Sequence, residues 1–191
     1  MRIVRTIIFI LVCIGLIWLC VALLARAFSG GNTTTVEEKP ALTTYATTDT
    51  EARMLIAGPI IQDQEHQSLR ITVGRAQTQI EVLTGYNGQV VRQGTYANTE
   101  SSYKEFLAGL DQLGFSEGIV SPATGAQQGK CPLGNRTTYT LEDSSTLIGE
   151  GWTTSCGPGS IRLNRNQIRT LFIRQIPAKE YTEITKDLTI V

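Results

Sequence analysis

Two cysteines, Cys131 and Cys156, carry the most reactive side chains in the C-terminal part of the chain, and Cys156 lies in the segment TTSCGPGS. A cysteine can act as a nucleophile, hold a metal ion or form a disulfide. A nucleophile needs a neighbouring base, and the sole histidine, His66, lies in QDQEHQS with no motif that links it to a cysteine. Two cysteines about 25 residues apart match no usual zinc spacing. We therefore expect no catalytic residue and no metal site, and a disulfide is favoured.

The two cysteines lie at the ends of a predicted β-hairpin. Its strands are RTTYTLE and LIGEGWTTSC, which flank the turn-rich sequence DSS. A turn around residues 143–144 would place Tyr139 opposite Ile148, and Cys131 opposite Cys156 at the open end. We therefore predict a Cys131–Cys156 disulfide, which would close a loop of about 26 residues and stabilise the fold by about 3–4 kcal/mol.

Three arginines near the C-terminus, Arg162, Arg165 and Arg169, have the helical spacing i, i+3 and i+7, and the last two lie in a predicted helix over residues 164–176. They lie opposite the apolar stripe of that helix, which consists of Ile168, Leu171, Phe172 and Ile176. This arrangement indicates a patch for an anionic envelope polymer, lipid head groups or an acidic protein partner. The alternative is an ordinary solvated helix face.

Two further patterns are weaker. Glu142, Asp143 and Glu150 provide the carboxylates of a hypothetical glycan hydrolase, which needs one raised and one ordinary pKa in a cleft. The segment ATGAQQGKCP resembles a phosphate-binding loop, but Thr124 stands where the first glycine is required and Cys131 where Ser or Thr is required. We therefore expect no cofactor.

The elements that would position these residues alternate between strands and helices. LRITV (69–73) and QIEVL (79–83) predict a β-hairpin, and RMLIAGPII and QVVRQGTY predict a strand on either side of it. A helix follows in NTESSYKEFLAGLDQLGF, with Ser102 and Glu105 in a capping box or with Asn98 or Thr99 capping an earlier start. The helix over 164–176 ends before Pro177, and DLTIV predicts a last strand. The order indicates an α+β fold, with two helices packed on a small, mostly antiparallel sheet.

The N-terminal region carries a membrane signal. Residues 7–25 contain no charge and would span about 28 Å as a helix, close to the thickness of a bilayer core. Arg2 and Arg5 precede this run, so the positive-inside rule puts residues 1–6 in the cytoplasm. We expect a transmembrane signal-anchor over 7–28 in the lipid bilayer, a Thr-rich stalk over 29–52 and an extracytoplasmic domain over 53–191. A signal peptide cleaved near Ala25-Arg26-Ala27 is the alternative.

The charge balance limits the classes of partner. The chain has 17 basic and 17 acidic residues. Three of the arginines lie in the first 26 residues, so the remainder is slightly acidic. A slightly acidic domain has no electrostatic footprint for nucleic acid.

The segments YKEFLAGLDQLGF, GWTTSCG and IRTLFIRQIP, together with Cys131, make residues 68–178 similar to uncharacterised single-pass membrane proteins of small-genome candidate-phylum bacteria. The resemblance implies a bacterial, envelope-facing location and supports the disulfide. That group has no assigned activity, so no functional residue is implied. We expect a non-enzymatic binding module of the cell envelope, which meets an envelope protein or an anionic polymer. A carboxylate-using hydrolase and an accessory subunit of a membrane complex are the alternatives.

Overall fold

A computed structural model describes residues 15–16, 18–20, 41–118, 129–157, 159–161 and 164–190. The chain divides into two units, Met1–Glu38 and Lys39–Val191. In the first unit the few described residues are helical and exposed. No helix within the described ranges is long and apolar enough to cross a membrane. The predictions for residues 1–6 and for most of 7–28 lie outside the described residues.

The second unit is an α+β domain, as predicted, with a six-stranded sheet. Its elements in chain order are η1 (Leu42–Thr47), β1 (Thr50–Ala57), η2 (Asp63–Glu65), β2 (Gln67–Gly74), β3 (Gln77–Thr84), β4 (Gln89–Ala97), α2 (Glu100–Gln112), α3 (Phe115–Gly118), β5 (Arg136–Asp143), β6 (Thr146–Thr154), α4 (Arg165–Ile173) and α5 (Ala178–Thr185). The two predicted hairpins are confirmed as β2–β3 and β5–β6, and the two predicted helices as α2 and α4.

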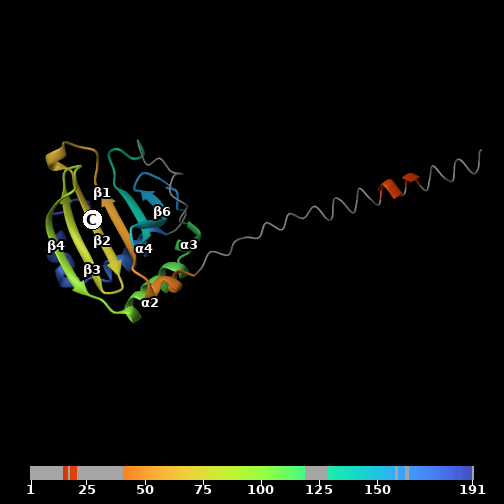
Figure 1. Ribbon diagram of the computed structural model, residues 1–191. Coiled ribbons are helices and arrows are strands. Elements are labelled where there is room, and N and C mark those ends of the chain that lie inside the picture. Colours follow the sequence, from red (N-terminus) through yellow and green to blue (C-terminus); the bar gives the residue numbers. More distant parts are fainter. Residues whose placement is uncertain are drawn as a thin grey trace, which may run out of the picture. The chain divides into compact units, whose positions relative to one another are not determined.

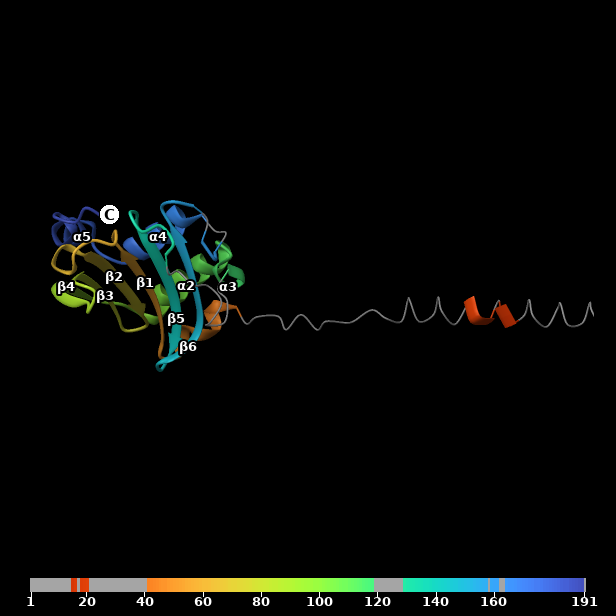
Figure 2. The same cartoon turned by 90° about the horizontal axis from the view of Figure 1, so that it is seen from above.

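The strands lie in the order β4-β3-β2-β1-β5-β6, and all neighbours are antiparallel (Figure 2). Strand β1 is central because it pairs with β2 on one side and with β5 on the other. Met54, for example, lies between Ile71 of β2 and Tyr139 of β5. The sheet therefore joins a four-stranded meander to the β5–β6 hairpin.

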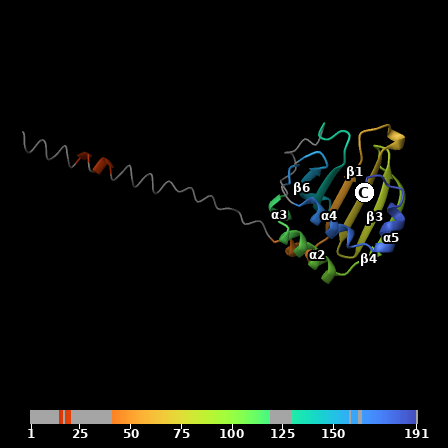
Figure 3. The ribbon, with the colours of Figure 1, turned by 180° about the vertical axis from the view of Figure 1, so that it is seen from behind.

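One face of the sheet is covered by helices and the other is polar. The strands are in front in Figure 1, and α4 and α5 are in front in Figure 3. Alternate strand residues on the covered face are buried and apolar, namely Ala52, Met54, Ile56, Leu69, Ile71, Val73, Ile80, Val82, Tyr139 and Leu141. On the other face, ion pairs link neighbouring strands, at 3.2 Å for Arg53–Glu142 and 2.6 Å for Arg70–Glu81. The hydrophobic core therefore lies between the sheet and the helices.

Helix α2 packs on the sheet through Tyr103, Phe106, Leu107 and Leu110, all of which are buried. Its N-cap is Thr99, whose side-chain oxygen accepts a hydrogen bond from the Ser102 N–H at 3.2 Å. The earlier of the two starts that the sequence allowed is therefore correct, and the Ser102–Glu105 capping box does not form the helix start.

The folded domain begins before residue 53, so part of the predicted stalk belongs to it. Residues 42–47 form η1, in which Leu42 and Ala46 are buried against the core. The Leu42 N–H also donates to the Asp111 carboxylate at 2.7 Å, which ties η1 to α2. The threonine-rich composition gave no indication of this short 3-10 helix, whose two buried apolar side chains pack beside α2.

The C-terminal segment also differs from the prediction. DLTIV is not a strand: residues 186–190 are turns and irregular backbone after α5, which the sequence analysis did not predict. Leu188 and Ile190 are nevertheless buried, and the Ile190 carbonyl accepts a hydrogen bond from the Asn135 side chain at 2.9 Å. The apolar residues of this segment therefore fill the core without joining the sheet.

Candidate functional site

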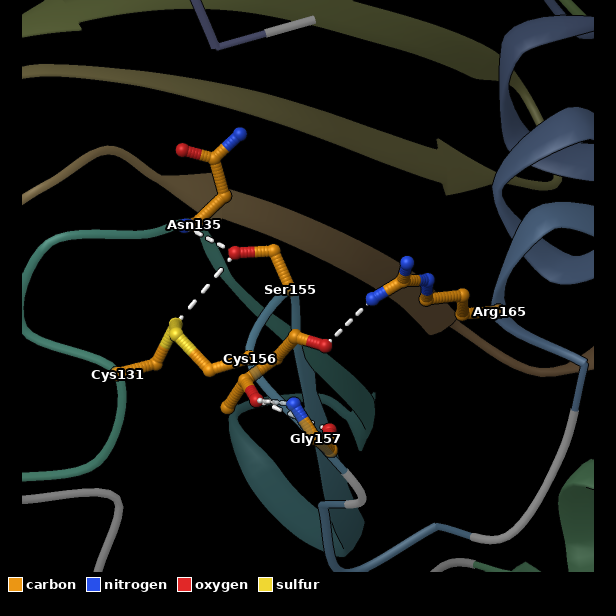
Figure 4. Close-up of a disulfide and its surroundings, with 7 residues drawn as sticks. Cys131, Asn135, Ser155, Cys156, Gly157 and Arg165 are labelled. Atoms are coloured by element: carbon orange, nitrogen blue, oxygen red, sulfur yellow. Dashed lines mark hydrogen bonds between the residues drawn. A yellow bond between two sulfur atoms is a disulfide. The ribbon is translucent and has the colours of Figure 1, made fainter.

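Cys131 and Cys156 form a disulfide, with Cα atoms 5.5 Å apart (Figure 4), which confirms the predicted pair. Ser155 lies beside it, and its hydroxyl accepts the Asn135 N–H at 2.9 Å. A side chain at Gly134 would place its Cβ 2.5 Å from the Cys131 sulfur. Only glycine therefore fits where the loop before β5 passes the disulfide.

The register of the β5–β6 hairpin is not the predicted one. Tyr139 pairs with Gly151, whereas the sequence placed it opposite Ile148. The turn lies at Ser144 and Ser145, which have φ angles of 47° and 77°, and the register shifts at a bulge between Leu141 and Glu142, just before the turn. Both changes shift the strands past one another. The disulfide still forms because the cysteines lie in loops beyond the paired residues.

The chain after the disulfide closes the outer edge of β6. The Trp152 N–H donates to the Ser160 hydroxyl at 2.9 Å, and the Ile161 N–H donates to the Trp152 carbonyl at 3.3 Å. At the first residue of α4, the Arg165 guanidinium donates to the Thr154 carbonyl at 2.6 Å (Figure 4). Arg165 is therefore held in place by the sheet edge.

A cavity of about 130 Å³ lies between the N-terminal end of α4 and the β5–β6 end of the sheet. This volume is about that of four water molecules. Its lining includes two arginines, Arg165 and Arg169, and five residues with hydroxyl groups, namely Thr137, Tyr139, Thr153, Thr154 and Ser155. We call it the arginine cavity.

The arginine cavity has a positive lining. No carboxylate lines it, and neither Arg165 nor Arg169 forms an ion pair with a carboxylate in the described part of the chain. A guanidinium has five N–H donors, so the bond from Arg165 to Thr154 leaves others for a ligand. The N–H groups of Asn166 and Gln167 at the start of α4 are already bound by the Asn164 side chain. The donors that a ligand would meet are therefore side chains.

Tyr139 supplies a neutral hydroxyl to this lining. Burial raises its pKa to about 12, although a hydrogen bond with Thr153 and the positive charges of Arg169 and Arg165 act in the opposite direction. The hydroxyl therefore keeps its proton at neutral pH, and it does not cancel the charge of the arginines.

The structure describes two of the three arginines of the predicted patch. Arg165 and Arg169 line one cavity, whereas Arg162 lies outside the described residues. Sequence analysis missed Thr137, Tyr139 and Thr153, although Thr137 and Tyr139 share a strand face by simple alternation. Thr153 joins them because it pairs with Thr137, and only the correct register reveals that pairing.

The other candidates do not line the arginine cavity. Glu142 is bound to Arg53, and neither Asp143 nor Glu150 lines the arginine cavity. The buried ring of His66 stacks on Tyr86 at 4.3 Å between centroids and has its Nδ1 atom 3.0 Å from the Pro59 carbonyl. Within the described ranges, no three His, Cys, Asp or Glu side chains gather as a metal site.

Protein-family models give no match to this chain, and curated proteins give none either. The geometry of the arginine cavity is therefore the basis for a function. Two guanidinium groups beside several hydroxyls, with no lining carboxylate, suit one anionic group such as a phosphate or carboxylate.

Proposed function

We propose that this chain is a non-enzymatic binding module of the cell envelope that holds an anionic group of its ligand in the arginine cavity. The observation that carries the proposal is the pair Arg165 and Arg169 beside hydroxyl groups, with no carboxylate in the lining. A planar guanidinium can bind two oxygens of a phosphate or carboxylate at once, which gives both affinity and orientation. The small volume restricts the cavity to the charged end of a larger molecule.

The location is the second part of the proposal: residues 7–28 anchor the chain in a membrane, with the domain outside. Two observations support it. Residues 7–25 are uniformly uncharged, and the domain contains a disulfide, a bond that persists in oxidising compartments and is rare in the cytosol.

Anion binding is tested on the full chain in detergent, by calorimetric titration with inorganic phosphate, sulfate and acetate. Arg169→Ala should weaken binding of the preferred anion about tenfold to hundredfold, because a hydrogen bond to a charged group contributes about 1.5–3 kcal/mol. Arg169 is the cleaner target, since Arg165 also holds the sheet edge.

The matched control is Arg174→Ala, at the C-cap of the same helix and outside the arginine cavity. It should leave the dissociation constant unchanged. Equal weakening by both variants would show a general charge effect, and unchanged binding by Arg169→Ala would reject the arginine cavity as the site.

The location is tested by alkylation of intact cells with a membrane-impermeant reagent. Peptides that contain Cys131 and Cys156 should be labelled only after a mild reductant is added, because the sulfurs are paired. Labelling that requires cell lysis but no reductant would place the domain in the cytosol with free thiols. A cytosolic protein of known reduced thiols serves as the control for leakage.

A further inference from the structure

The two edge strands of the sheet, β6 and β4, differ in whether other residues cover their outer backbone groups. The outer edge of β6 is closed by Ser160, Ile161 and Arg165, as described above. The outer edge of β4 has no such cover among the described residues. Edge strands with free N–H and C=O groups are templates for another strand, so the open edge of β4 needs an explanation.

The free backbone groups on β4 follow from the hydrogen-bond pattern. The Asn98 N–H, directly after β4, donates to the Ala76 carbonyl at 2.8 Å and therefore points toward β3. Inward and outward residues alternate along an antiparallel strand, so Gly94 and Tyr96 also point toward β3. Gln93 and Thr95 then point outward, and the described part of the chain provides no partner for their backbone groups.

A groove of about 690 Å³ runs beside this edge. One wall is β4 and the other is α5, which lies next to β4 (Figure 3). The two elements pack closely at Gly94, where a Cβ atom would lie 2.9 Å from the Ile184 side chain. A groove of this size is in the range of ligand-binding sites, and its long side is a strand edge.

The α5 wall is acidic. Glu180 and Glu183 line the groove, and neither forms an ion pair with a described residue. Burial raises the pKa of the Tyr96 hydroxyl, and the negative charges of Glu180 and Glu183 raise it further. These two carboxylates therefore lie near β4. Asp187 is different, because Arg92 binds it at 2.9 Å. Lys186, at the C-cap of α5, also lines the groove. The lining therefore carries three carboxylates and two cations, which leaves one net negative charge beside a free strand edge.

We propose that the edge of β4 and the acidic groove beside α5 form a docking site for an extended, basic segment of a partner protein. The segment would add a strand to the sheet through the outward backbone groups of Gln93 and Thr95. Its alternate side chains would face α5, so lysine or arginine at every second position would meet Glu180 and Glu183. This site is separate from the arginine cavity and does not depend on it.

A second copy of this chain fits the groove less well. Two copies that paired through β4 would form an isologous interface, in which the same surface meets itself. Each copy would then bring Glu180 and Glu183 to the junction, and like charges repel. A basic segment supplies the opposite charge, so the acidic lining favours a different protein.

The probe is a fluorescent peptide of alternating lysine and valine with blocked termini, titrated by anisotropy into the full chain in detergent. A peptide of alternating glutamate and valine is its control. Thr95→Pro removes an outward N–H at an edge position where proline is tolerated, and it should weaken binding of the lysine peptide at least about tenfold. Glu180→Gln with Glu183→Gln should weaken it about threefold to tenfold and reduce its salt dependence.

The matched control for charge is Glu100→Gln with Glu105→Gln, two exposed positions on α2, which should leave the affinity unchanged. Arg169→Ala should also leave it unchanged. Equal binding of both peptides, or full binding by both the proline and the glutamine variants, would overturn the proposal. Self-association in sedimentation that Thr95→Pro abolishes would assign the edge to a second copy and overturn it as well.

Discussion

Phe172→Ala is expected to lower the free energy of unfolding by about 3–5 kcal/mol, the usual cost of emptying a buried aromatic site. Phe172 on α4 is fully buried at the centre of the core. Its ring meets Phe106 of α2 edge-on, with centroids 5.1 Å apart, and lies 6.0 Å from the Tyr139 ring of β5. Removal of the ring therefore leaves a cavity where two helices and the sheet meet. Urea denaturation followed by circular dichroism measures the change.

Two variants make this result specific. Phe172→Leu keeps most of the apolar volume and should cost less than about 1.5 kcal/mol if the core repacks. Leu133→Ala removes a side chain that is 83% exposed and should change the stability by less than about 0.5 kcal/mol. If Phe172→Ala cost no more than Leu133→Ala, the packing of α4 on the sheet would be wrong.

Removal of the disulfide should have the second largest effect. Cys131→Ala with Cys156→Ala is expected to lower the free energy of unfolding by about 3–4 kcal/mol, because the unfolded chain then gains the freedom of a loop of about 26 residues. The loss should be visible as a lower midpoint in urea and a lower Tm. Reductant added to the native protein should reproduce it.

The double variant controls for other effects of the reductant. It has no disulfide to reduce, so its urea midpoint should be the same with and without reductant. Cys20 is exposed and unpaired, so Cys20→Ser should keep the full response to reductant. A native protein whose stability does not change when Cys131 and Cys156 become titratable as thiols would contradict the stabilising role of the bond.

The elements that the sequence predicts correctly carry strong local periodicity. The β2–β3 hairpin alternates apolar and polar residues around a short turn, and α2 has an apolar stripe of four buried residues. These patterns are independent of the rest of the chain. The disulfide was also predictable, because two cysteines flank one hairpin and no third ligand or base accompanies them.

The parts that the sequence does not predict depend on contacts between distant segments. Leu42 and Ala46 are buried only because α2 lies beside them, and nothing in a threonine-rich stretch indicates that neighbour. Leu188 and Ile190 suggested a strand, but the fold uses them as apolar filling in irregular backbone. Burial was predictable for these residues, whereas the element type was not.

The same division holds for the arginine cavity. Helical spacing predicts that Arg165 and Arg169 share a face, which the structure confirms by placing both at one cavity. The hydroxyls of Thr137 and Thr153 join them through a hairpin register that a bulge and an unusual turn determine. Local patterns cannot fix a register to one residue, so the pairing of Thr137 with Thr153 was not predictable.

The central place of β1 has a consequence for the order of folding. Its pairs with β2 close loops of roughly 10 to 25 residues, whereas its pairs with β5 join residues roughly 80 to 90 positions apart. The meander from β1 to β4 and the β5–β6 hairpin can each form from near neighbours, and we expect their union at β1 to form last because it closes the longest loop. Until then β1 has a bare apolar edge, the surface through which an incompletely folded chain would aggregate.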